Sequence, residues 1–584
     1  MNADKHLLSL LANLKLPTQE LSTLSFCQSS KADRVRRWAE ELPATRITQT
    51  SAMLYQALPE VTRLKTPADN RLAMLESLRP YVQQCIQGLA KSFLNQPLIL
   101  PEGAMKTAVV AQALQKHMSN GYMLAAKEYL LKPEKFRKTH TEQISLSLHR
   151  ALTGMGLQLL RSYQLYTQAP IQLWAESHTL YRVAEEENLL KHPVNDELLE
   201  QAKANTIEQV YMRMLLLSCA NSNQLNQTDV GILYRALEEW SKHVHLSQEP
   251  DNNIFAVNLS GNMPPNYSKR FNTDGQVELR TLDLDSLNYE LNQLAKGQAS
   301  HKIKRPPLMN EALFKHCLKV WGQIHERDNA RRPATGGMDV IVGLSALHFY
   351  TCEEQEFHAF LHHPKQRSKA VKKSPDFNAA KLATEHDPWA QAFVSDVEPP
   401  GKAPHMADEE AREMYPIHKV ERIDASPGGY CLQWHEAIPS QVRSGELLGL
   451  REPNRKHWNI GVIRWVKQNR GGTLLGIQLL APNAEAYAIQ LINKSGENGE
   501  FMRALFLPAN KALKQQASLL APSVPFQAQN KVRLNHHGIT DTAHLTECIF
   551  STSAMSQFYF RQLENTSGEG QAQQQQADDF NSDW

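Results

Sequence analysis

Apolar residues recur at helical spacing through the first part of the chain and at alternate positions through the last part. In the first part this spacing predicts helices near residues 69–92, 107–132, 140–163 and 171–190, separated by Pro, Asn or Asp. The pattern therefore predicts an all-α N-terminal domain over residues 1–245, built as a stack of helical hairpins. Such stacks often bind a protein partner, although ordinary core packing explains the same residues equally well.

The composition changes near residue 246. Residues 254–259 and 277–282 are typical of strands, and residues 286–294 are typical of a helix. We therefore expect a small β-containing module over residues 246–300, followed by a connecting helix within residues 301–326.

Alternation of apolar and polar residues dominates from residue 338 onward. Strands are predicted over residues 338–344, 430–434, 458–466, 476–480, 501–507, 531–534, 545–550 and 557–563. A basic run followed by a Pro-containing acidic stretch interrupts this pattern, so we predict a solvated, partly disordered insertion over about residues 353–412. The Gln-rich residues 567–584 are predicted to form a disordered tail.

Two short motifs belong to this β-rich part. Residues 326–333 read ERDNARRP and contain R-x-x-x-R immediately before the first strand, and residues 423–430 read IDASPGGY and contain D-x-S-x-x-G at a strand turn. Together they resemble the PilZ family of cyclic di-GMP receptors. The strands WNIGVIRWV at 458–466 and GIQLL at 476–480 are similar to the closing pair of the PilZ barrel. The roughly ninety residues between the motifs depart from a compact PilZ domain, and far exceed a hairpin connection.

The resemblance implies a multidomain α + β protein. Its parts would be the N-terminal all-α helical-hairpin domain, a PilZ-type antiparallel β-barrel over residues 327–485 that contains the insertion, and an additional β-subdomain over residues 486–566. The ligand would be cyclic di-GMP, with no further cofactor. The output implied by such receptors is surface behaviour: type IV pili, flagellar motility, attachment or biofilm.

The resemblance also implies a role for each motif residue. Arginine suits this ligand because its planar fork can bind a phosphate, pair with guanine O6 and N7, or stack on the base. The implied ligand-binding residues are Arg327 and Arg331 as anchors, Arg332 as added charge or a solvent-facing residue, Asp424 as acceptor for the guanine N1–H and amino group, Ser426 as partner of a base or phosphate oxygen, and Gly429 as the point of close backbone approach.

Charge and composition narrow the choice of partner. The 584 residues contain 63 Lys and Arg against 61 Asp and Glu, so the formal charge is only +2. DNA or RNA binding is disfavoured because a protein that wraps a phosphate backbone needs a larger basic surplus. No run approaches the roughly 18 apolar residues of a membrane helix, so membrane insertion is not expected. Seven scattered cysteines without C-x-x-C favour a reducing cytoplasm.

Two alternatives stay open. One is a scaffold whose degenerate PilZ-like domain no longer binds nucleotide. The other is a metal-dependent enzyme that uses the His-rich segment 348–363, where residues four apart share a helix face. Its candidate ligands are His348, Cys352, Glu354, His358, His362 and His363. We favour a solvated helix with incidental histidines and no metal. No Walker-type loop, G-x-S-x-G or paired-carboxylate motif is present, and Ser426 has no local base, so an enzyme is not expected.

Overall fold

The computed structural model describes most of the chain. The described residues are 2–96, 98, 100–248, 253–271, 278–300, 302–322, 332–362, 412–426, 428–436, 438–453, 455, 457–469, 471–492, 499–509, 516–552 and 554–563. They divide into two compact units. The first unit lies within residues 1–331, 433–444 and 464–476, and the second within residues 332–432, 445–463 and 477–584.

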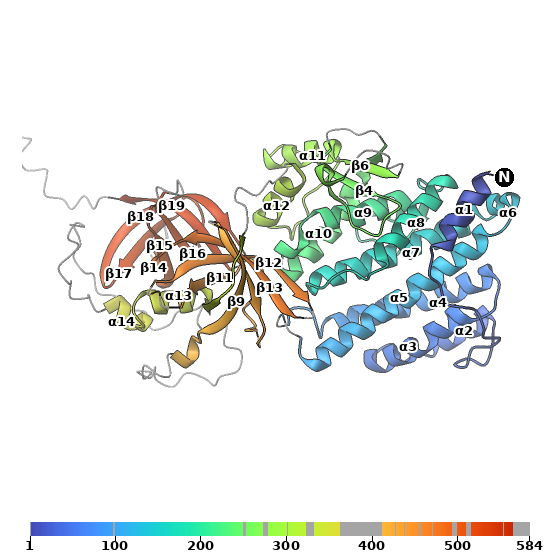
Figure 1. The fold of residues 1–584 in the computed structure, drawn as a ribbon, viewed down its shortest axis with the longest axis horizontal. Helices are drawn as coiled ribbons and strands as arrows, with labels where there is room; N and C mark the ends of the chain where they lie inside the picture. Colours follow the sequence, from blue (N-terminus) through green and yellow to red (C-terminus); the bar gives the residue numbers. More distant parts are fainter. Residues whose placement is uncertain are drawn as a thin grey trace, which may run out of the picture. The chain divides into compact units, whose positions relative to one another are not determined.

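The first unit is mainly helical (Figure 1). Its helices are α1 (Asn2–Ala12), α2 (Ala32–Glu40), α3 (Ile47–Arg63), α4 (Ala68–Ala90), α5 (Glu102–Leu130), α6 (Glu134–Thr139), α7 (Thr141–Gln164), α8 (Leu173–Glu186), α9 (Ile207–Cys219), α10 (Gln227–Trp240), α11 (Asp285–Ala295) and α12 (Glu311–Gly322), with 3-10 turns η1 (Ser222–Gln224), η2 (Ser241–His243) and η3 (Ser268–Arg270). Helix α7 packs against α5 on one side and against α9 and α10 on the other. The four predicted N-terminal helices are therefore present, with ends shifted by a few residues.

Local sequence signals explain where two of these helices begin. Thr206 and Gln209 form a reciprocal capping box at the start of α9, which satisfies backbone N–H groups that have no partner inside the helix. The side chain of Asn226 accepts from the backbone N–H of Asp229 at the start of α10. These caps orient α9 and α10, which form one wall of the cavity described below.

Two small sheets belong to the same unit. The strands β1 (Pro193–Asn195) and β2 (Ala204–Thr206) pair antiparallel, so the all-α prediction for residues 1–245 is wrong at this point. The second sheet has the order β3-β6-β4-β5, with β3 (His245–Ser247), β4 (Phe255–Asn258), β5 (Asn266–Tyr267) and β6 (Leu279–Asp283). Its buried residues, together with those of α11 and α12, belong to the same hydrophobic cluster as the N-terminal helices.

The middle sheet has seven strands in the order β10-β13-β12-β11-β8-β9-β7. They are β7 (Arg332–Pro333), β8 (Gly337–Val342), β9 (His418–Ser426), β10 (Gly429–Trp434), β11 (Leu447–Arg451), β12 (Asn459–Asn469) and β13 (Gly472–Ala481). Strand β10 also pairs with β9, which closes a ring of six strands, and β7 is an extra strand beside β9. The predicted barrel and the predicted pairing of its two late strands are confirmed.

The residues after β8 differ from the prediction. Leu344 was expected in the first strand, but it lies in helix α13 (Gly343–Thr351), which begins at Gly343 with φ +89°. Helix α14 (Phe357–His362) follows, and its Phe360 is fully buried. The predicted solvated insertion is therefore wrong over residues 357–362, because apolar side chains of α14 pack against strands of the last barrel. Residues 363–411 of the predicted insertion lie outside the described residues.

The last part of the chain forms a second closed barrel, in the order β14-β15-β16-β19-β18-β17. Its strands are β14 (Glu485–Leu491), β15 (Met502–Leu507), β16 (Ser518–Pro522), β17 (Lys531–His536), β18 (Ile539–Ser551) and β19 (Met555–Leu563). The predicted additional β-subdomain is thus confirmed, although β14 and β16 were not anticipated. The predicted tail over residues 567–584 lies outside the described residues.

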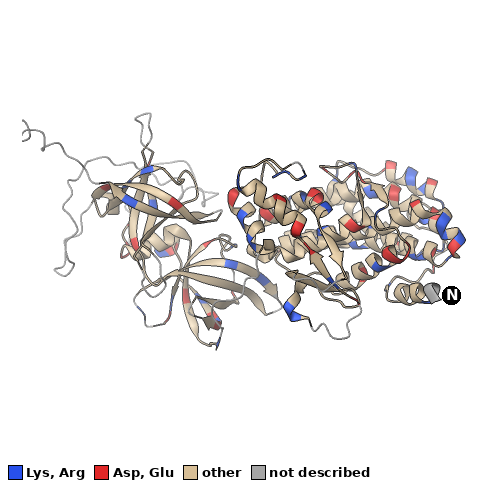
Figure 2. Cartoon of the chain, turned by 90° about the horizontal axis from the view of Figure 1, so that it is seen from above, with Lys and Arg blue, Asp and Glu red and all other residues tan. Residues whose placement is uncertain are grey.

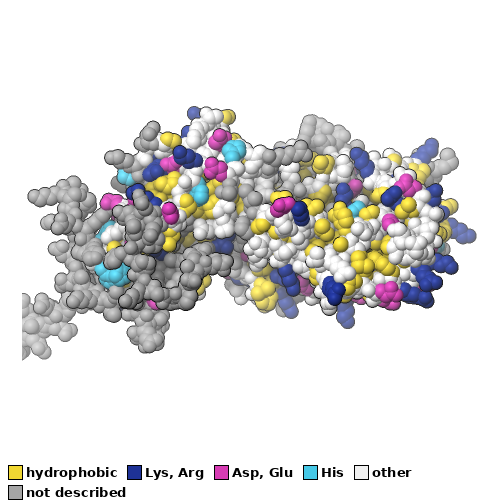
Figure 3. All heavy atoms as spheres, turned by 90° about the horizontal axis from the view of Figure 1, so that it is seen from below, with side chains coloured by type: hydrophobic (Ala, Val, Ile, Leu, Met, Phe, Trp, Pro, Cys, Tyr) yellow, Lys and Arg dark blue, Asp and Glu magenta, His cyan; other side chains and the backbone are white. Residues whose placement is uncertain are grey.

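The surface mixes charge and apolar groups. Lys and Arg are interspersed with Asp and Glu over the chain (Figure 2), and apolar side chains are scattered among them (Figure 3). Within the described ranges, no helix combines the length and the apolar character that a membrane crossing needs.

Candidate functional site

The D-x-S-x-x-G motif lies on the hairpin formed by β9 and β10. Side chains two residues apart on a strand point to the same face, so Arg422, Asp424 and Ser426 share one face of β9. All three are half-buried, whereas Glu421 and Ile423 on the opposite face are exposed. The motif's acidic and hydroxyl groups therefore face the same side at the end of this strand.

Strand β7 lies beside the motif. It pairs antiparallel with β9, with Arg332 opposite Ala425 and Pro333 opposite Asp424. The pairing continues where the backbone N–H of Ala334 donates to the carbonyl of Ile423 at 3.2 Å. The structure therefore brings Arg332 and Pro333, which follow the R-x-x-x-R motif, next to the acidic turn across the long stretch of sequence that separates them.

Gly429 is required by a close backbone approach. A Cβ atom at this position would lie 1.9 Å from the carbonyl oxygen of Ile477 on β13, a distance that no side chain tolerates. The neighbouring Gly428 carbonyl accepts from the backbone N–H of Leu479 at 3.0 Å, and the Ser426 hydroxyl donates to the Gly429 carbonyl at 3.3 Å. The turn is thus held tightly against β13, and this tight packing positions Asp424 and Ser426.

Arg422 is a polar residue of this face that the motif search missed. Its guanidinium donates to Glu452 Oε1 at 2.6 Å and to the Thr335 carbonyl at 3.4 Å. Its backbone N–H donates to the carbonyl of Gly336, which has φ +133°. The alternation that places it on the face of Asp424 was available in the sequence, but its partner Glu452 lies on a distant segment.

Tyr430 adds an aromatic hydroxyl close to this ion pair. Burial is the main cause that raises the pKa of Tyr430, and the Glu452 carboxylate raises it further while Arg422 opposes the shift. The phenol is therefore a neutral hydrogen-bonding group at ordinary pH.

The predicted site residues are only partly covered by the structure. Arg332, Asp424, Ser426 and Gly429 lie on the adjoining strands β7, β9 and β10, with Arg332 exposed. Arg327 and Arg331 lie outside the described residues. A second R-x-x-x-R sequence begins at Arg451, and this side chain pairs with Asp339 at 2.9 Å and lies over the ring of Trp458.

The His-rich segment is not the solvated helix that we expected. His348 is buried at 1% exposure and packs edge-on against Phe357 and Phe360. The Cys352 sulfur lies 3.8 Å from His348 Nδ1. Among the described residues, no three His, Cys, Asp or Glu side chains are placed to share a metal ion; His363 lies outside them.

Comparison with known proteins covers nearly the whole chain. Residues 33–251 match the model of the N-terminal domain of the cyclic-di-GMP receptor FimW, residues 254–486 match that of its middle PilZ domain, and residues 487–563 match that of its C-terminal β-barrel domain. The cyclic-di-GMP receptor FimW of Pseudomonas aeruginosa is 32% identical over 583 residues, covering 94% of each chain. No solved structure matches the chain.

Proposed function

This chain belongs to the FimW family of cyclic-di-GMP receptors, and from this membership we propose that it binds cyclic di-GMP where β7, β9 and β10 adjoin. The single observation that carries the proposal is the register that sets Arg332 opposite Ala425 and Pro333 opposite Asp424. Because Arg331 is bonded to Arg332, this register supports a site that uses both motifs.

The residues divide the recognition of the ligand. Arg331 and Arg327 bind phosphate oxygens or the O6 and N7 edge of guanine, since the guanidinium fork matches either pair of acceptors. Arg332 is exposed and adds positive charge. Two phosphodiester charges need only such a local cationic cluster, which agrees with the nearly neutral total charge of the chain.

The hairpin reads the base. The Asp424 carboxylate accepts from the guanine N1–H and amino group, whereas adenine presents an acceptor at N1 and is rejected. The Ser426 hydroxyl bonds a base or phosphate oxygen, and Gly429 keeps the turn close to β13.

The output is a protein contact rather than catalysis. The family is described as a receptor family, and the helical unit is the proposed binding surface for a partner that controls type IV pili, motility or attachment. We place this activity in the cytoplasm, where the seven free thiols are favoured.

Calorimetric titration of the full chain with cyclic di-GMP tests the proposal. Arg331→Ala should weaken binding by more than tenfold, because loss of a charge-assisted anchor costs about 2–3 kcal/mol. Arg561→Ala is the matched control, since Arg561 is an exposed arginine of the other barrel, and it should leave the affinity unchanged. Cyclic di-AMP should not compete. A wild-type chain that binds no cyclic di-GMP would support the scaffold alternative instead.

A further inference from the structure

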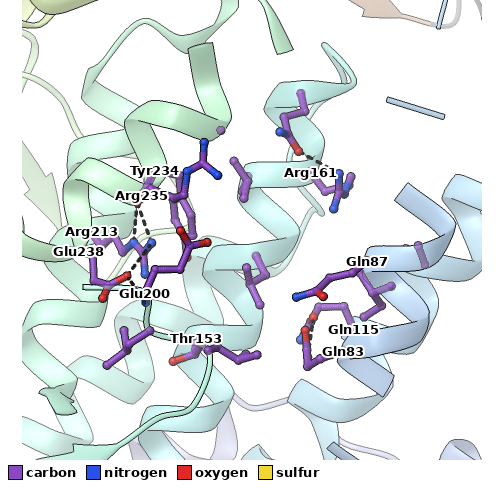
Figure 4. A pocket seen from close by; sticks show the side chains of 18 of the residues that line it. Gln83, Gln87, Gln115, Thr153, Arg161, Glu200, Arg213, Tyr234, Arg235 and Glu238 are labelled. Carbon is purple, nitrogen blue, oxygen red and sulfur yellow. Dashed lines mark hydrogen bonds and ion pairs between the residues drawn. The ribbon is translucent and has the colours of Figure 1, made fainter. Parts of the chain in front are cut away.

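The helical unit contains a cavity of about 380 Å³ that the nucleotide site does not use. It lies along α7, between α4 and α5 on one side and α9 and α10 on the other (Figure 4), and we call it the α7 groove. Gln87 and Glu200 at its margin are exposed, so the groove is accessible from solvent.

Side-chain amides line much of this groove. Gln83 and Gln87 lie four residues apart and share a face of α4, and Gln83 donates to Gln115 of α5 at 3.2 Å. Gln164 of α7 donates to the carbonyl of Gln227 at 3.2 Å. An amide side chain offers a donor and an acceptor in one plane, the same pair that a peptide bond carries. Such a lining suits an extended peptide backbone.

Two of the three acidic residues that line the groove already have partners. Asp196 forms ion pairs with Arg79 at 2.6 Å and with Arg150 at 3.0 Å. Glu238 accepts from the backbone N–H groups of residues 200–202. These carboxylates therefore have little capacity left to attract a cation.

Two arginines that line the groove, unlike these carboxylates, have no ion-pair partner among the described residues. In the described part of the chain, neither Arg161 nor Arg235 has a carboxylate within ion-pair distance. Arg161 donates to Gln164 at 2.9 Å and lies 5.1 Å from the Phe93 ring centre, and burial lowers its pKa to about 10. Figure 4 shows Arg161 on α7 and Arg235 on α10, on opposite sides of the groove. Arg161 and Arg235 outnumber Glu200, the one lining carboxylate without an ion pair among the described residues, so the groove keeps a net positive charge.

A buried hydroxyl also lacks a partner. The Thr153 hydroxyl oxygen is inaccessible to solvent and makes no hydrogen bond with any described residue, although helical threonines commonly bond the preceding turn. An unsatisfied buried polar atom is costly and calls for an explanation. Because solvent does not reach this oxygen, a ligand could bond it only after the Thr153 side chain rotates into the groove that it lines.

The groove has the dimensions of a short extended chain. Its lining follows α7 from Thr153 to Gln164, which at about 1.5 Å per residue is about 16 Å. That length accommodates about five residues of extended peptide at about 3.3 Å each. We propose that the α7 groove binds an extended peptide segment of a protein partner, with an acidic side chain of that segment between Arg161 and Arg235. The identity of this partner as the receptor's output rests on the proposed function, but the binding itself does not.

Fluorescence polarisation on the full chain without nucleotide tests this site. The probes are two pools of fluorescein-labelled, C-terminally amidated pentapeptides drawn from Gly, Ala, Ser and Gln, one with a fixed central Glu and one with Gln there. The Glu pool should bind at least tenfold more tightly, because a charge-assisted hydrogen bond replaces a neutral one. Higher salt should reduce this difference. Equal binding of the two pools would overturn the proposal. It would also be overturned if millimolar inorganic phosphate displaced the Glu pool and the Gln pool from the protein to the same extent.

Three variants locate the binding. Arg161→Met and Arg235→Met should each lower affinity for the Glu pool by tenfold or more, while Arg37→Met, at an exposed arginine of α2, should change nothing. Without peptide, Arg161→Met should keep or raise the Tm, since it removes a charge that burial penalises. A lower Tm with unchanged preference for the Glu pool would show a purely structural arginine and overturn its assignment.

Failure of the two proposals is distinguishable. Arg161→Met should bind cyclic di-GMP like the wild-type chain. Peptide binding without nucleotide binding would remove only the proposed function, and nucleotide binding without a preference for the Glu pool would remove only this inference.

Discussion

Both barrels are closed rings of six strands, but only the middle barrel carries an extra strand, β7, beside one of its members. In the C-terminal barrel each of the six strands has two neighbours in a closed ring. In the middle barrel, β9 pairs along one side with two separate short strands, β7 and β8, which are divided at Gly336. Strand β7 sets Pro333 opposite Asp424. The candidate site therefore combines an added strand, β7, with one hairpin of the barrel, β9–β10, and the closed ring alone does not make it.

The hairpins of the two barrels show the same contrast. The β17–β18 turn consists of His537 and Gly538, both with positive φ, as a tight two-residue hairpin requires. The preceding His536 stacks on Tyr487, and its Nδ1–H donates to the Ala486 carbonyl at 3.0 Å. The side chain at the end of β17 thus packs against β14, whereas the end of β9 presents the Asp424 carboxylate and the Ser426 hydroxyl.

The barrels are nevertheless coupled energetically. One hydrophobic cluster contains Ile460 and Val462 of β12, Leu347 of α13, and Leu505 and Leu520 of the C-terminal barrel. A second cluster, which includes residues of β14, β17, β18 and β19, belongs to the C-terminal barrel alone. A substitution in the first cluster should therefore destabilise both barrels, and one in the second cluster should destabilise the C-terminal barrel alone.

The largest expected effect is that of Leu520→Ala. Leu520 is fully buried in the shared cluster, so the truncation should lower the free energy of unfolding by about 3 kcal/mol. Amide hydrogen exchange should accelerate in β11 and β12 as well as in the C-terminal barrel. Leu545→Ala, in the second cluster, is the control that should act on the C-terminal barrel alone. Identical exchange patterns for the two variants would contradict separate clusters.

Asp424→Asn should come next and should affect ligand binding. Loss of the charged acceptor should weaken cyclic di-GMP binding by about 2 kcal/mol, with little change in Tm. Its counterpart Asp541→Asn alters a half-buried aspartate of β18 whose pKa burial raises, and it should leave the affinity unchanged. Calorimetry on both variants measures the difference. Equal losses would mean that the middle hairpin has no special role.

The smallest expected effect concerns acid stability. Burial is the main cause that lowers the pKa of His348 well below 6.5, and Arg503, His537 and His536 oppose its charging further. Below pH 6.5 the unfolded chain gains a proton that the folded chain does not, so stability falls as pH falls. The loss reaches about 1.4 kcal/mol at pH 5.5.

Thermal unfolding between pH 7.5 and 5.5 measures this term. His348→Leu should remove this contribution, so its Tm should fall less between pH 7.5 and 5.5 than the Tm of the wild-type chain. His358→Leu, at an exposed position of α14, should keep the pH dependence of the wild-type chain. The same slope in both variants would show that His348 is not the group responsible.

Much of the architecture was predictable from local pattern. Helical spacing predicted α4, α5, α7 and α8, and alternation predicted most of the barrel strands, because both periods are written into neighbouring residues. The pair of motifs was also sufficient to predict the PilZ-type barrel and the receptor family, which the comparisons confirm. The ligand-binding roles of Arg327, Arg331, Arg332, Asp424, Ser426 and Gly429 remain predictions.

Other features depended on contacts between distant segments. Local pattern predicts a solvated stretch at α14 because nothing near its apolar residues in sequence indicates the strands that bury them. Strands β14 and β16 were missed for the same reason. Arg422 could have been placed on the face of Asp424 from alternation alone, but its ion pair with Glu452 could not.

The sequence by itself determined the types of element, their order and the residue chemistry of the two motifs. Only the tertiary structure decided that Pro333 lies opposite Asp424. It also decided that Arg161 and Thr153 line one groove, where, among the described residues, Arg161 has no carboxylate partner and the Thr153 hydroxyl has no hydrogen-bond partner. The reason is physical: periodicity reports which face of an element is buried, whereas register and packing between remote segments decide what that face meets.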